Sequence, residues 1–345
     1  MAKNRIKRRV LIDGNMVWVT GDTEQEYAEN LMKAMLDKYE PVKAEKPKHE
    51  FKAYALNWFN TYSKPNIETA TAVTYERQLR LYLFPAFAGK NVEDINSQDI
   101  QEMFNSIQGA KETKQKVRMV LNMILEQAIE EELIPRNPLQ SKNIRIKGRK
   151  ALDTEPYSVE QMQQLVGNLD KVVEPLDRAY LALQALHPMR LEEVLGLKYG
   201  DIDRKKGVIY IRRSATHPTR NQAEVKETKT EASKRKIKLV SEIIGYLPEG
   251  KPNDFIFGGK TPLSYSVLRR MLQRIQRDIG FEESISPRRF RTTVLTDIYD
   301  STKDIKATQQ AAGHATATMT LKHYVKGRVH NDESRTNIST LYGLG

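Results

Sequence analysis

Residues 286–293 read SPRRFRTT, and this stretch places Arg288, Arg289 and Arg291 close together directly after a proline. Like charges at such spacing repel one another, so the segment requires either an anion between the side chains or a wet surface over which they spread. The stretch lies within a mostly helical pattern that runs from Ser264 to Tyr324. The charge and organisation of the rest of the chain indicate which anion these arginines would bind.

The composition points to a chain of several units with an anionic partner. With 345 residues the chain is too long for one compact core, and its 39% apolar residues provide enough material for two or three. The formal net charge of +12 favours a polyanion, of which nucleic acid is the obvious candidate. A surface that is basic only for solubility remains the alternative, because basic composition alone identifies no chemistry.

Several classes of site are disfavoured by the residues that the chain lacks. It has no cysteine, which excludes disulfides and thiolate metal sites, and its 6 scattered histidines count against a metal site. Gly259-Lys260-Thr261 imitates a nucleotide-binding loop, but Asp254 stands where that loop needs a glycine. No signal-peptide core follows the basic start MAKNRIKRRV, and no run approaches the ~20 apolar residues that span a membrane. We therefore expect a cytoplasmic protein without a cofactor, a metal or a membrane partner.

The first half of the chain predicts a β-hairpin with a helix, followed by a helical region. Two β-prone runs flank Asp13-Gly14-Asn15, which is a strong hairpin signal, and Thr23 can cap the helix that follows. Helical periodicity then continues from Phe51 to about Pro138. The stretch QSKNIRIKGRKALD (140–153) comes next and carries five basic residues with little apolar content, which is typical of a linker.

The second half mixes helices with short strands. Ser158 and Gln161 form a capping-box pattern, and a strand is expected after a turn at Lys206-Gly207. In KRKIKLV (234–240) basic and apolar residues alternate, so one face of a strand can pack while the other faces an anion. The predicted fold class is therefore mainly α with small β elements (α+β). The predicted parts are an N-terminal unit (1–45), a helical domain (48–140), a basic linker (141–155), a mixed domain (156–328) and a tail (329–345).

One segment of the mixed domain contains an arginine and a carboxylate at helical spacing. In LHPMRLEEVLGL (186–197), Pro188 suits a first helical position. Arg190 and Glu193 lie three residues apart, so the carboxylate can orient the guanidinium. Taken alone, this pair is more typical of an ordinary surface contact than of a site.

Two further segments carry groups that could transfer protons or attack phosphorus. VKETKTEASKRKIKL (225–239) could present a lysine as a proton donor, but composition does not single one out. In QQAAGHATATMTLKHYVK (309–326), Gly313 ends one helix, His314 stands in the break and Tyr324 lies on the next short helix. A tyrosine hydroxyl can attack phosphorus where nearby cations stabilise its phenoxide. Tyr324 is also one of 15 tyrosines and could simply pack in a core.

In their order and spacing these segments resemble the tyrosine recombinase family, and in particular the integrases of phages and integrative elements. The resemblance covers nearly the whole chain. The first arginine box of the family matches Pro188-Met189-Arg190 through Glu193. A Thr-Lys-Thr-x-x-Ser-x-Arg signature matches Thr228 to Arg235, which singles out Lys229 as the catalytic lysine that the resemblance implies.

The remaining signatures of the family lie nearer the C-terminus. The Gly-His signature matches Gly313-His314, and the nucleophile position ten residues beyond the histidine matches Tyr324. The second box, usually Pro-His-x-x-Arg-His-Thr, matches residues 287–293, so Arg291 aligns with the second catalytic arginine and Arg288 replaces the box histidine. Arginine can donate to a phosphate oxygen but cannot act as a base near neutral pH, so the resemblance implies only a phosphate contact for Arg288.

The resemblance implies a site-specific DNA recombinase, which cuts and rejoins strands through a 3′-phosphotyrosyl link and integrates a phage or mobile element. Tyr324 would be the nucleophile, Lys229 would protonate the departing 5′-oxygen, and Glu193 would have a supporting role. The implied catalytic residues are Arg190, Lys229, Arg288, Arg291, His314 and Tyr324. The implied partners are double-stranded DNA at attachment sites and a homo-tetramer on that DNA, with the C-terminal tail docked on a neighbouring protomer. The need for an excision factor or a host DNA-bending protein stays open.

Two other interpretations also stay open. A catalytically silent DNA-binding protein on the same scaffold is supported only by the departure at Arg288. Against a recombinase that resolves chromosome dimers stands the extra N-terminal unit, whose Arg5, Lys7, Arg8 and Arg9 suit a second class of DNA site flanking the crossover. All of these interpretations imply work on DNA in the cytoplasm of a bacterial host, at the nucleoid.

Overall fold

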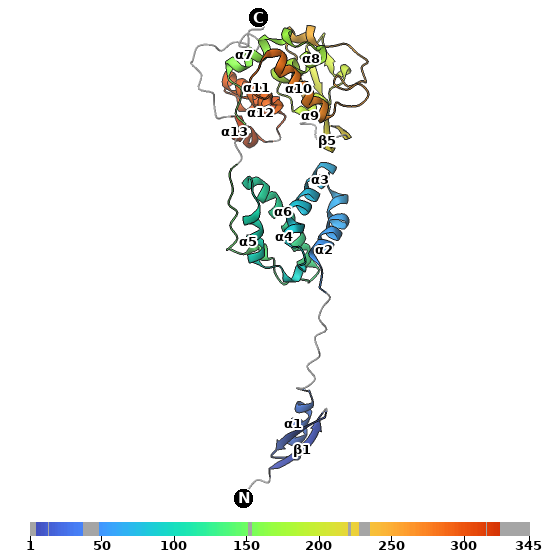
Figure 1. Ribbon diagram of the computed structural model, residues 1–345, viewed down its shortest axis with the longest axis vertical. Helices are drawn as coiled ribbons and strands as arrows, with labels where there is room; N and C mark the ends of the chain where they lie inside the picture. The colour runs from blue at the N-terminus through green and yellow to red at the C-terminus, as the bar shows by residue number, and fades with distance from the viewer. Residues whose placement is uncertain are drawn as a thin grey trace.

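The structure, a computed structural model, describes residues 5–12, 14–36, 48–150, 154–219, 222–227, 235–314 and 316–324 (Figure 1). These residues form a β-hairpin unit with one helix, a helical unit and a larger mixed unit, in that order along the chain. The predicted fold class, mainly α with small β elements, is confirmed. Within the described ranges no helix combines the length and the apolar character needed to cross a membrane.

The N-terminal unit is an antiparallel hairpin with one helix packed on it. Its elements are β1 (Ile6–Ile12), β2 (Asn15–Gly21) and α1 (Glu24–Leu36). The chain turns at Gly14, whose φ of +82° lies in the left-handed region that glycine adopts without strain. Helix α1 starts after Thr23, whose Oγ1 accepts a hydrogen bond from the N–H of Glu26 at 3.1 Å. The hairpin and the helix that the sequence predicted are confirmed.

The helical unit has one continuous core. Its α-helices are α2 (Phe51–Trp58), α3 (Thr69–Gln78), α4 (Phe84–Ala86), α5 (Ser97–Ser106) and α6 (Lys111–Glu130). π-Helical turns at Phe59–Ser63 and Leu79–Leu83 continue α2 and α3, and 3-10 turns lie at Lys64–Asn66, Val92–Asp94 and Pro138–Gln140. Helix α6 buries Val117, Val120, Leu121 and Ile124 completely. This spacing of three and four residues gives one apolar face, which the other helices cover.

The chain that follows α6 stays against the helical unit. Ile144 and Ile146 pack on its core. The N–H of Lys111, at the start of α6, donates to the carbonyl oxygen of Arg149 at 2.9 Å. The first part of the segment predicted as a linker, residues 141–155, therefore lies along the helical unit.

The mixed unit is built around α8. Its helices are α7 (Val159–Gly167), α8 (Pro175–Leu186), α9 (Leu191–Leu195), α10 (Tyr265–Ile279), α11 (Pro287–Thr302), α12 (Ile305–Ala312) and α13 (Ala317–Tyr324). Short 3-10 turns lie at Leu169–Lys171, Tyr199–Asp201 and Ser241–Tyr246. Every residue from Ala179 to Leu186 is buried, and α7, α9, α10 and α11 all contact α8. A helix that is buried on all sides forms the middle of a core.

Two small sheets complete the mixed unit. Their strands are β3 (Ile202–Asp203), β4 (Val208–Ile211), β5 (Arg213–Thr219), β6 (Gln222–Glu227) and β7 (Arg235–Lys238). The first sheet is antiparallel with the order β3-β4-β7, so β7 lies at an edge, and β5 and β6 form a separate hairpin. The strands near 208 and 235 were predicted, whereas the β5–β6 hairpin was not. Its pairing is irregular between Thr216 and Thr219, which obscures the alternation that reveals a strand.

Two local predictions for the mixed unit have different outcomes. The capping box of Ser158 and Gln161 is confirmed, with both reciprocal hydrogen bonds present at the start of α7. The prediction that Pro188 occupies a first helical position is wrong, because α9 begins only at Leu191. Arg190 precedes the helix with an extended backbone (φ −72°, ψ 152°). Arg190 is therefore the last residue before the helix.

The helical and mixed units meet where α3 approaches β5 (Figure 1). Lys226 on β6 forms an ion pair with Glu68, which directly precedes α3. Glu224, two residues from Lys226 on the same strand, lies 3.5 Å from it as a second carboxylate partner. The β5–β6 hairpin thus links the two units through charged side chains.

Candidate active site

The site begins with Glu193, which lies in the first turn of α9. Its Oε2 accepts a hydrogen bond from the backbone N–H of Arg190 at 2.7 Å, and its Oε1 accepts one from Arg190 Nη1 at 2.9 Å. The first contact caps the free end of the helix, and the second holds the guanidinium. The carboxylate therefore orients Arg190 through both its backbone and its side chain.

A second arginine, Arg235 on β7, grips the same carboxylate. Its Nη1 and Nη2 donate to the two oxygens of Glu193, each at 2.8 Å, and its Nε donates to the carbonyl oxygen of Ala311 at 3.1 Å. The side chain of Arg235 is only 8% exposed. Arg235 was not predicted from the sequence to be a site residue. The alternation of basic and apolar residues along β7 could have identified it, because Arg235 lies on the same face as the buried Ile237 while Lys236 is exposed.

Arg291 enters the cluster from α11 and is almost fully buried. Its Nη1 donates to the carbonyl oxygen of Pro188 at 2.6 Å, and its Nη2 donates to that of Ala312 at 2.7 Å. Nη1 also lies 4.0 Å from Oε2 of Glu193. Helix α11 thereby brings a third guanidinium to a site formed by the segment before α9 and by the end of α12.

His314 lies in the turn that joins α12 to α13. Gly313 ends α12 with a φ of +61°, and this left-handed residue reverses the chain so that His314 points back to Arg291. The Nε2 atom of His314 lies 3.3 Å from Arg291 Nη2, and its Nδ1 lies 3.0 Å from Thr320 Oγ1 on α13. Because a guanidinium only donates, Nε2 accepts from Arg291 and the Nδ1–H donates to Thr320. The imidazole in this arrangement is neutral.

The electrostatics of the cluster favour an anion. Burial alone would raise the pKa of the Glu193 carboxyl, but its hydrogen bonds with Arg235 and Arg190 and their charges lower it to about 2. One permanent negative charge therefore faces three arginines, Arg190, Arg235 and Arg291. Arg190 is the most exposed of the three, at 38% for its side chain, so it is the cation that an approaching anion would meet first. The excess of positive charge suits a phosphate.

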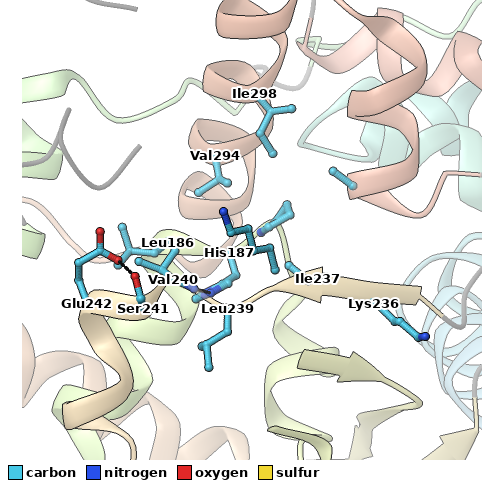
Figure 2. Close-up of a pocket in the computed structure, with 13 residues that line it drawn as sticks. Leu186, His187, Lys236, Ile237, Leu239, Val240, Ser241, Glu242, Val294 and Ile298 are labelled. Atoms are coloured by element: carbon cyan, nitrogen blue, oxygen red, sulfur yellow. Dashed lines mark hydrogen bonds between the residues drawn. The ribbon is translucent and has the colours of Figure 1, made fainter. Parts of the chain in front are cut away.

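A cavity of about 310 Å³ with a mixed polar and apolar lining lies next to the cluster (Figure 2). Val294 and Ile298 of α11 face it from one side, and Ile237 and the chain that follows β7 face it from the other. Pro188 and Ala311, whose carbonyl oxygens bind the arginines, also line it. The cavity is therefore bounded by the same backbone segments that position the guanidinium groups.

His187 fixes the backbone between this cavity and the cluster. The histidine is 1% exposed, with its Nδ1 placed 3.0 Å from the carbonyl oxygen of Leu183 and its Nε2 accepting from the N–H of Val240 at 3.2 Å. Burial lowers the pKa of His187 to about 4, although the hydrogen bond with Leu183 opposes that shift. A neutral imidazole thus holds the end of α8 against the chain after β7, one residue before Pro188.

The other predicted site residues lie apart from the network or outside the described part of the chain. Arg288 is exposed in the first turn of α11, and within the described ranges no hydrogen bond or ion pair connects its side chain to the cluster. Arg289 turns away, with its Nη1 2.5 Å from Glu283 Oε2. Lys229 lies outside the described residues. Tyr324 is the last residue of α13, and its side chain is outside them too.

The residues that the structure describes include no group of three or more histidine or carboxylate side chains that could hold a metal ion. The cluster itself offers fixed cations, an imidazole and donated hydrogen bonds. Such groups stabilise negative charge that develops on a phosphate.

Two family models match most of the chain. Residues 157–330 match the phage integrase family, and residues 51–143 match the phage integrase central domain. The chain belongs to the phage integrase family. The first match covers the mixed unit, with all of the arginine cluster, and the second covers the helices of the helical unit. The predicted resemblance to the tyrosine recombinases and their integrases is confirmed.

Relatives of this phage integrase family member include a tyrosine recombinase XerC from Thermodesulfovibrio yellowstonii. The two are 26% identical over 166 residues, which cover 46% of this chain and 54% of the relative. The chain thus spans about half the length of the curated relative it matches.

The fold is shared with two solved integrases. The Tn1549 transposon integrase, in complex with a circular intermediate DNA, is 20% identical with a TM-score of 0.66 over 81% of this chain and 95% of that one. A lambda integrase dimer bound to a COC′ core site is 16% identical with a TM-score of 0.61 over 95% of this chain and 94% of that one. At these identities the likeness establishes the fold alone.

Proposed function

We propose that this protein is a site-specific DNA recombinase that integrates a phage or other mobile element by cutting and rejoining DNA strands through a 3′-phosphotyrosyl intermediate. The observation that carries the proposal is the buried cluster in which Arg190, Arg291 and His314 surround the end of α12. Arg190 Nη2 lies 3.4 Å from the carbonyl oxygen of Gly313, and Arg291 binds that of Ala312, so both cations lie beside the same turn. Two cations and an imidazole at one point suit a single phosphodiester.

The reaction follows from the charge that builds up at phosphorus. Tyr324 attacks the scissile phosphodiester and remains joined to the 3′-phosphate, while the 5′-oxygen departs and takes a proton from Lys229. Arg190 and Arg291 stabilise the non-bridging oxygens as their negative charge grows, which is the main barrier to such a transfer. The bond to tyrosine keeps the phosphodiester energy, so a 5′-hydroxyl from another duplex can reverse the attack. No ATP is required.

The placement of α13 supports Tyr324 as the nucleophile. Thr320 on this helix is buried and hydrogen-bonded to His314. Residues four apart lie on the same side of an α-helix. Tyr324 stands four residues after Thr320 on this helix, a spacing that fits its proposed role as the nucleophile.

His314 would act on the phosphate as a hydrogen-bond donor. In the DNA-free protein its Nε2 accepts from Arg291 and its proton is on Nδ1. A phosphate bound at Arg291 would lie within reach of the imidazole, and a nearby anion favours the protonated, hydrogen-bond-donating form of such a ring.

The N-terminal unit supports binding to a second class of DNA site. Its hairpin pairs Arg9 with Trp18, and Lys7 lies two residues from Arg9 on the same face. Lys7 Nζ stands 4.8 Å from the centre of the Trp18 ring, which is 56% exposed. A cationic face with an exposed aromatic ring suits a nucleic-acid surface better than a protein core.

The proposed partners are double-stranded DNA and further copies of this chain. Support comes from structural relatives, among them a lambda integrase tetramer bound to a Holliday junction, which shares the fold with a TM-score of 0.58 at 16% identity. We propose attachment sites as the DNA and a homo-tetramer as the active assembly, with an excision factor and a host DNA-bending protein as accessory partners. The work on chromosomal DNA would take place in the cytoplasm of a bacterial host.

A recombinase that resolves chromosome dimers is the second candidate, because the curated relative is a XerC. That relative matches 46% of this chain. The N-terminal hairpin with its cationic face argues for the integrase, because a second DNA-binding unit serves flanking sites. Deleting residues 1–45 separates the two functions, since a dimer-resolving enzyme would recombine a simple core site equally well without them.

The decisive experiment uses a nicked suicide substrate that traps the covalent intermediate. Wild-type protein should form a DNA adduct that survives denaturation, and Tyr324→Phe should bind the same DNA but form no adduct. An adduct that persists in Tyr324→Phe would remove the assignment of the nucleophile. Binding without any adduct in the wild type would favour the catalytically silent interpretation.

A further inference from the structure

Arg235 and Glu193 form the most completely buried ion pair of the cluster. Their side chains are 8% and 5% exposed, and two parallel hydrogen bonds of 2.8 Å join them. Planar bidentate pairing of this kind fixes orientation as well as distance. The Oε1 atom that Arg235 binds is the same atom that holds Arg190 Nη1 at 2.9 Å. The direction in which Glu193 holds Arg190 thus depends on Arg235.

Arg235 is also wedged against the turn that carries His314. Its Nε donates to Ala311, and a Cβ added to Gly313 would come within 3.0 Å of its Nη1. The guanidinium is therefore enclosed between the carboxylate of Glu193 and the end of α12. One side chain contacts the segments that present two separate groups of the site, Arg190 and His314.

The charges of the cluster give Arg235 a further effect. Every charged side chain that faces Glu193 in the described residues is an arginine: Arg235, Arg190 and, at 4.0 Å, Arg291. Without Arg235, the Glu193 carboxylate would have to form its ion pairs with Arg190 and Arg291 alone. It would then draw their guanidinium groups inward and neutralise part of the charge that an anion needs.

We infer that Arg235 is a positioning residue, which pairs with Glu193 and so fixes the direction in which Glu193 holds Arg190 beside Arg291 for binding a phosphate. It touches the carboxylate and the α12 turn, and it reaches the reacting atoms only through them. Its effect on strand cleavage rests on the proposed function, whereas its effect on Glu193 and Arg190 does not. The nearest equivalent elsewhere in the unit is Arg274, which binds the buried Asp177 through two hydrogen bonds of 2.8 Å.

The first test measures the cluster without DNA. Glutamate labelled with ¹³C at the carboxyl carbon allows Glu193 to be followed by NMR, with Glu193→Gln identifying its resonance, and the Nε resonances of the arginines report on Arg190. In the wild type and in Arg274→Met, the Glu193 signal should not titrate between pH 8 and pH 4.5. In Arg235→Met its midpoint should rise by one unit or more, and the Arg190 resonance should move.

The same measurement contains the result that would overturn the inference. If the Glu193 midpoint and the Arg190 resonance of Arg235→Met match those of Arg274→Met, then Arg235 does not position the site. If Arg235→Met does not fold, as far-UV circular dichroism would reveal, Arg235→Lys takes its place. Lysine keeps the charge but offers no planar pair, so the Arg190 resonance should still move.

The second test uses covalent adduct formation and a double-mutant cycle. Arg235→Met should form the adduct at least tenfold more slowly than the wild type, while Arg274→Met should stay within twofold. In a Glu193→Gln background, Arg235→Met should cost less than threefold, because the carboxylate through which it acts is gone. Equal losses in both backgrounds would contradict the inference. Absence of any adduct in the wild type would contradict the proposed function. The NMR result alone would then show whether Arg235 positions Glu193 and Arg190.

Discussion

Arg291 on α11 donates to the carbonyl oxygen of Pro188 at 2.6 Å. Pro188 stands two residues before Arg190, so this bond joins the helix of the second arginine box to the segment that presents the first. The two proposed phosphate-binding cations are separated by about a hundred residues in sequence, and one buried hydrogen bond holds their backbones together. A lysine at position 291 could not reproduce the fork that binds both Pro188 and Ala312.

Arg291→Lys should therefore lower the rate of adduct formation by roughly 100- to 1,000-fold, as expected when one fixed donor to a developing oxyanion is lost. DNA binding should change little, because most of the affinity comes from other phosphate contacts. Single-turnover cleavage and gel-shift assays measure the two quantities separately. Arg289→Met serves as the matched control on the same helix, since Arg289 faces Glu283. A similar loss of rate in both variants would indicate damage to α11 rather than loss of a phosphate contact.

Arg288 tests the departure at the first histidine of the usual second box. Its side chain is exposed at the start of α11 and lies free to reach a bound DNA. Arg288→Ala should slow cleavage by about tenfold, the amount expected for a single hydrogen bond to a charged group, and Arg288→His should keep most of the activity. Alanine without any effect would make Arg288 a surface charge only.

The buried His187 should make the fold sensitive to acid. Its pKa of about 4 lies below the ordinary value of 6.5, so the unfolded chain takes up a proton first as the pH falls. Stability is therefore lost from about pH 6.5 down to pH 4, by roughly 3 kcal/mol in total for this group. Urea unfolding at pH 7 and pH 4 should reveal a smaller loss in His187→Gln than in the wild type. An equal loss of stability in the two proteins would mean that protonation of His187 does not destabilise the fold.

Protonation of Glu193 should also destabilise the fold as the pH falls, but in a lower pH range than protonation of His187. Its carboxyl pKa of about 2 lies below the ordinary 4.5, so its stabilising contribution is complete above pH 4.5 and disappears as the pH falls towards 2. In Glu193→Gln the fold should therefore lose less stability than the wild type between pH 4.5 and pH 2.5. Thermal unfolding at these two pH values provides the comparison.

The N-terminal hairpin should contribute to DNA binding through charge and stacking. Lys7→Ala and Trp18→Ala should weaken binding to flanking sites and leave binding to a core site unchanged. Loss of one phosphate contact at Lys7 should lower the slope of log affinity against log salt by about one. Fluorescence anisotropy over a range of salt concentrations measures this slope. Equal effects on both classes of DNA would contradict a separate role for the hairpin.

The apolar end of the chain, LYGLG (341–345), provides the last prediction. Truncation after Asn337 should leave DNA binding by a single protomer intact and impair recombination, because the tail is expected to dock on a neighbouring protomer. Normal recombination by the truncated protein would count against that contact.

The sequence predicted those features that depend on nearby residues. The Ser158–Gln161 capping box and the Gly313 helix end were recognised because their signals lie within a few positions of the structure that they form. The start of α9 was misplaced, because tertiary contacts of His187 and Pro188 with Val240 and Arg291 keep that segment extended. No local pattern contains those partners.

In the candidate site, too, contacts between residues close in sequence could be predicted, whereas contacts between distant segments could not. Arg190 and Glu193 are three residues apart, and their contact could be expected from helical spacing. Arg235 was missed because its partners Glu193 and Ala311 lie 42 and 76 positions away. Among so many lysines and arginines, composition could not distinguish the one cation of β7 that points inward.

Gly313 and Arg235 constrain each other in a way that bears on how such chains can evolve. At position 313 the backbone has a φ of +61°, and a Cβ there would meet the Arg235 guanidinium at 3.0 Å. A lineage that keeps the arginine can add a side chain at position 313 only if the guanidinium moves by a few tenths of an ångström, whereas one that first shortens residue 235 faces only the backbone strain. The order in which two substitutions arrive would then affect how readily the second is tolerated.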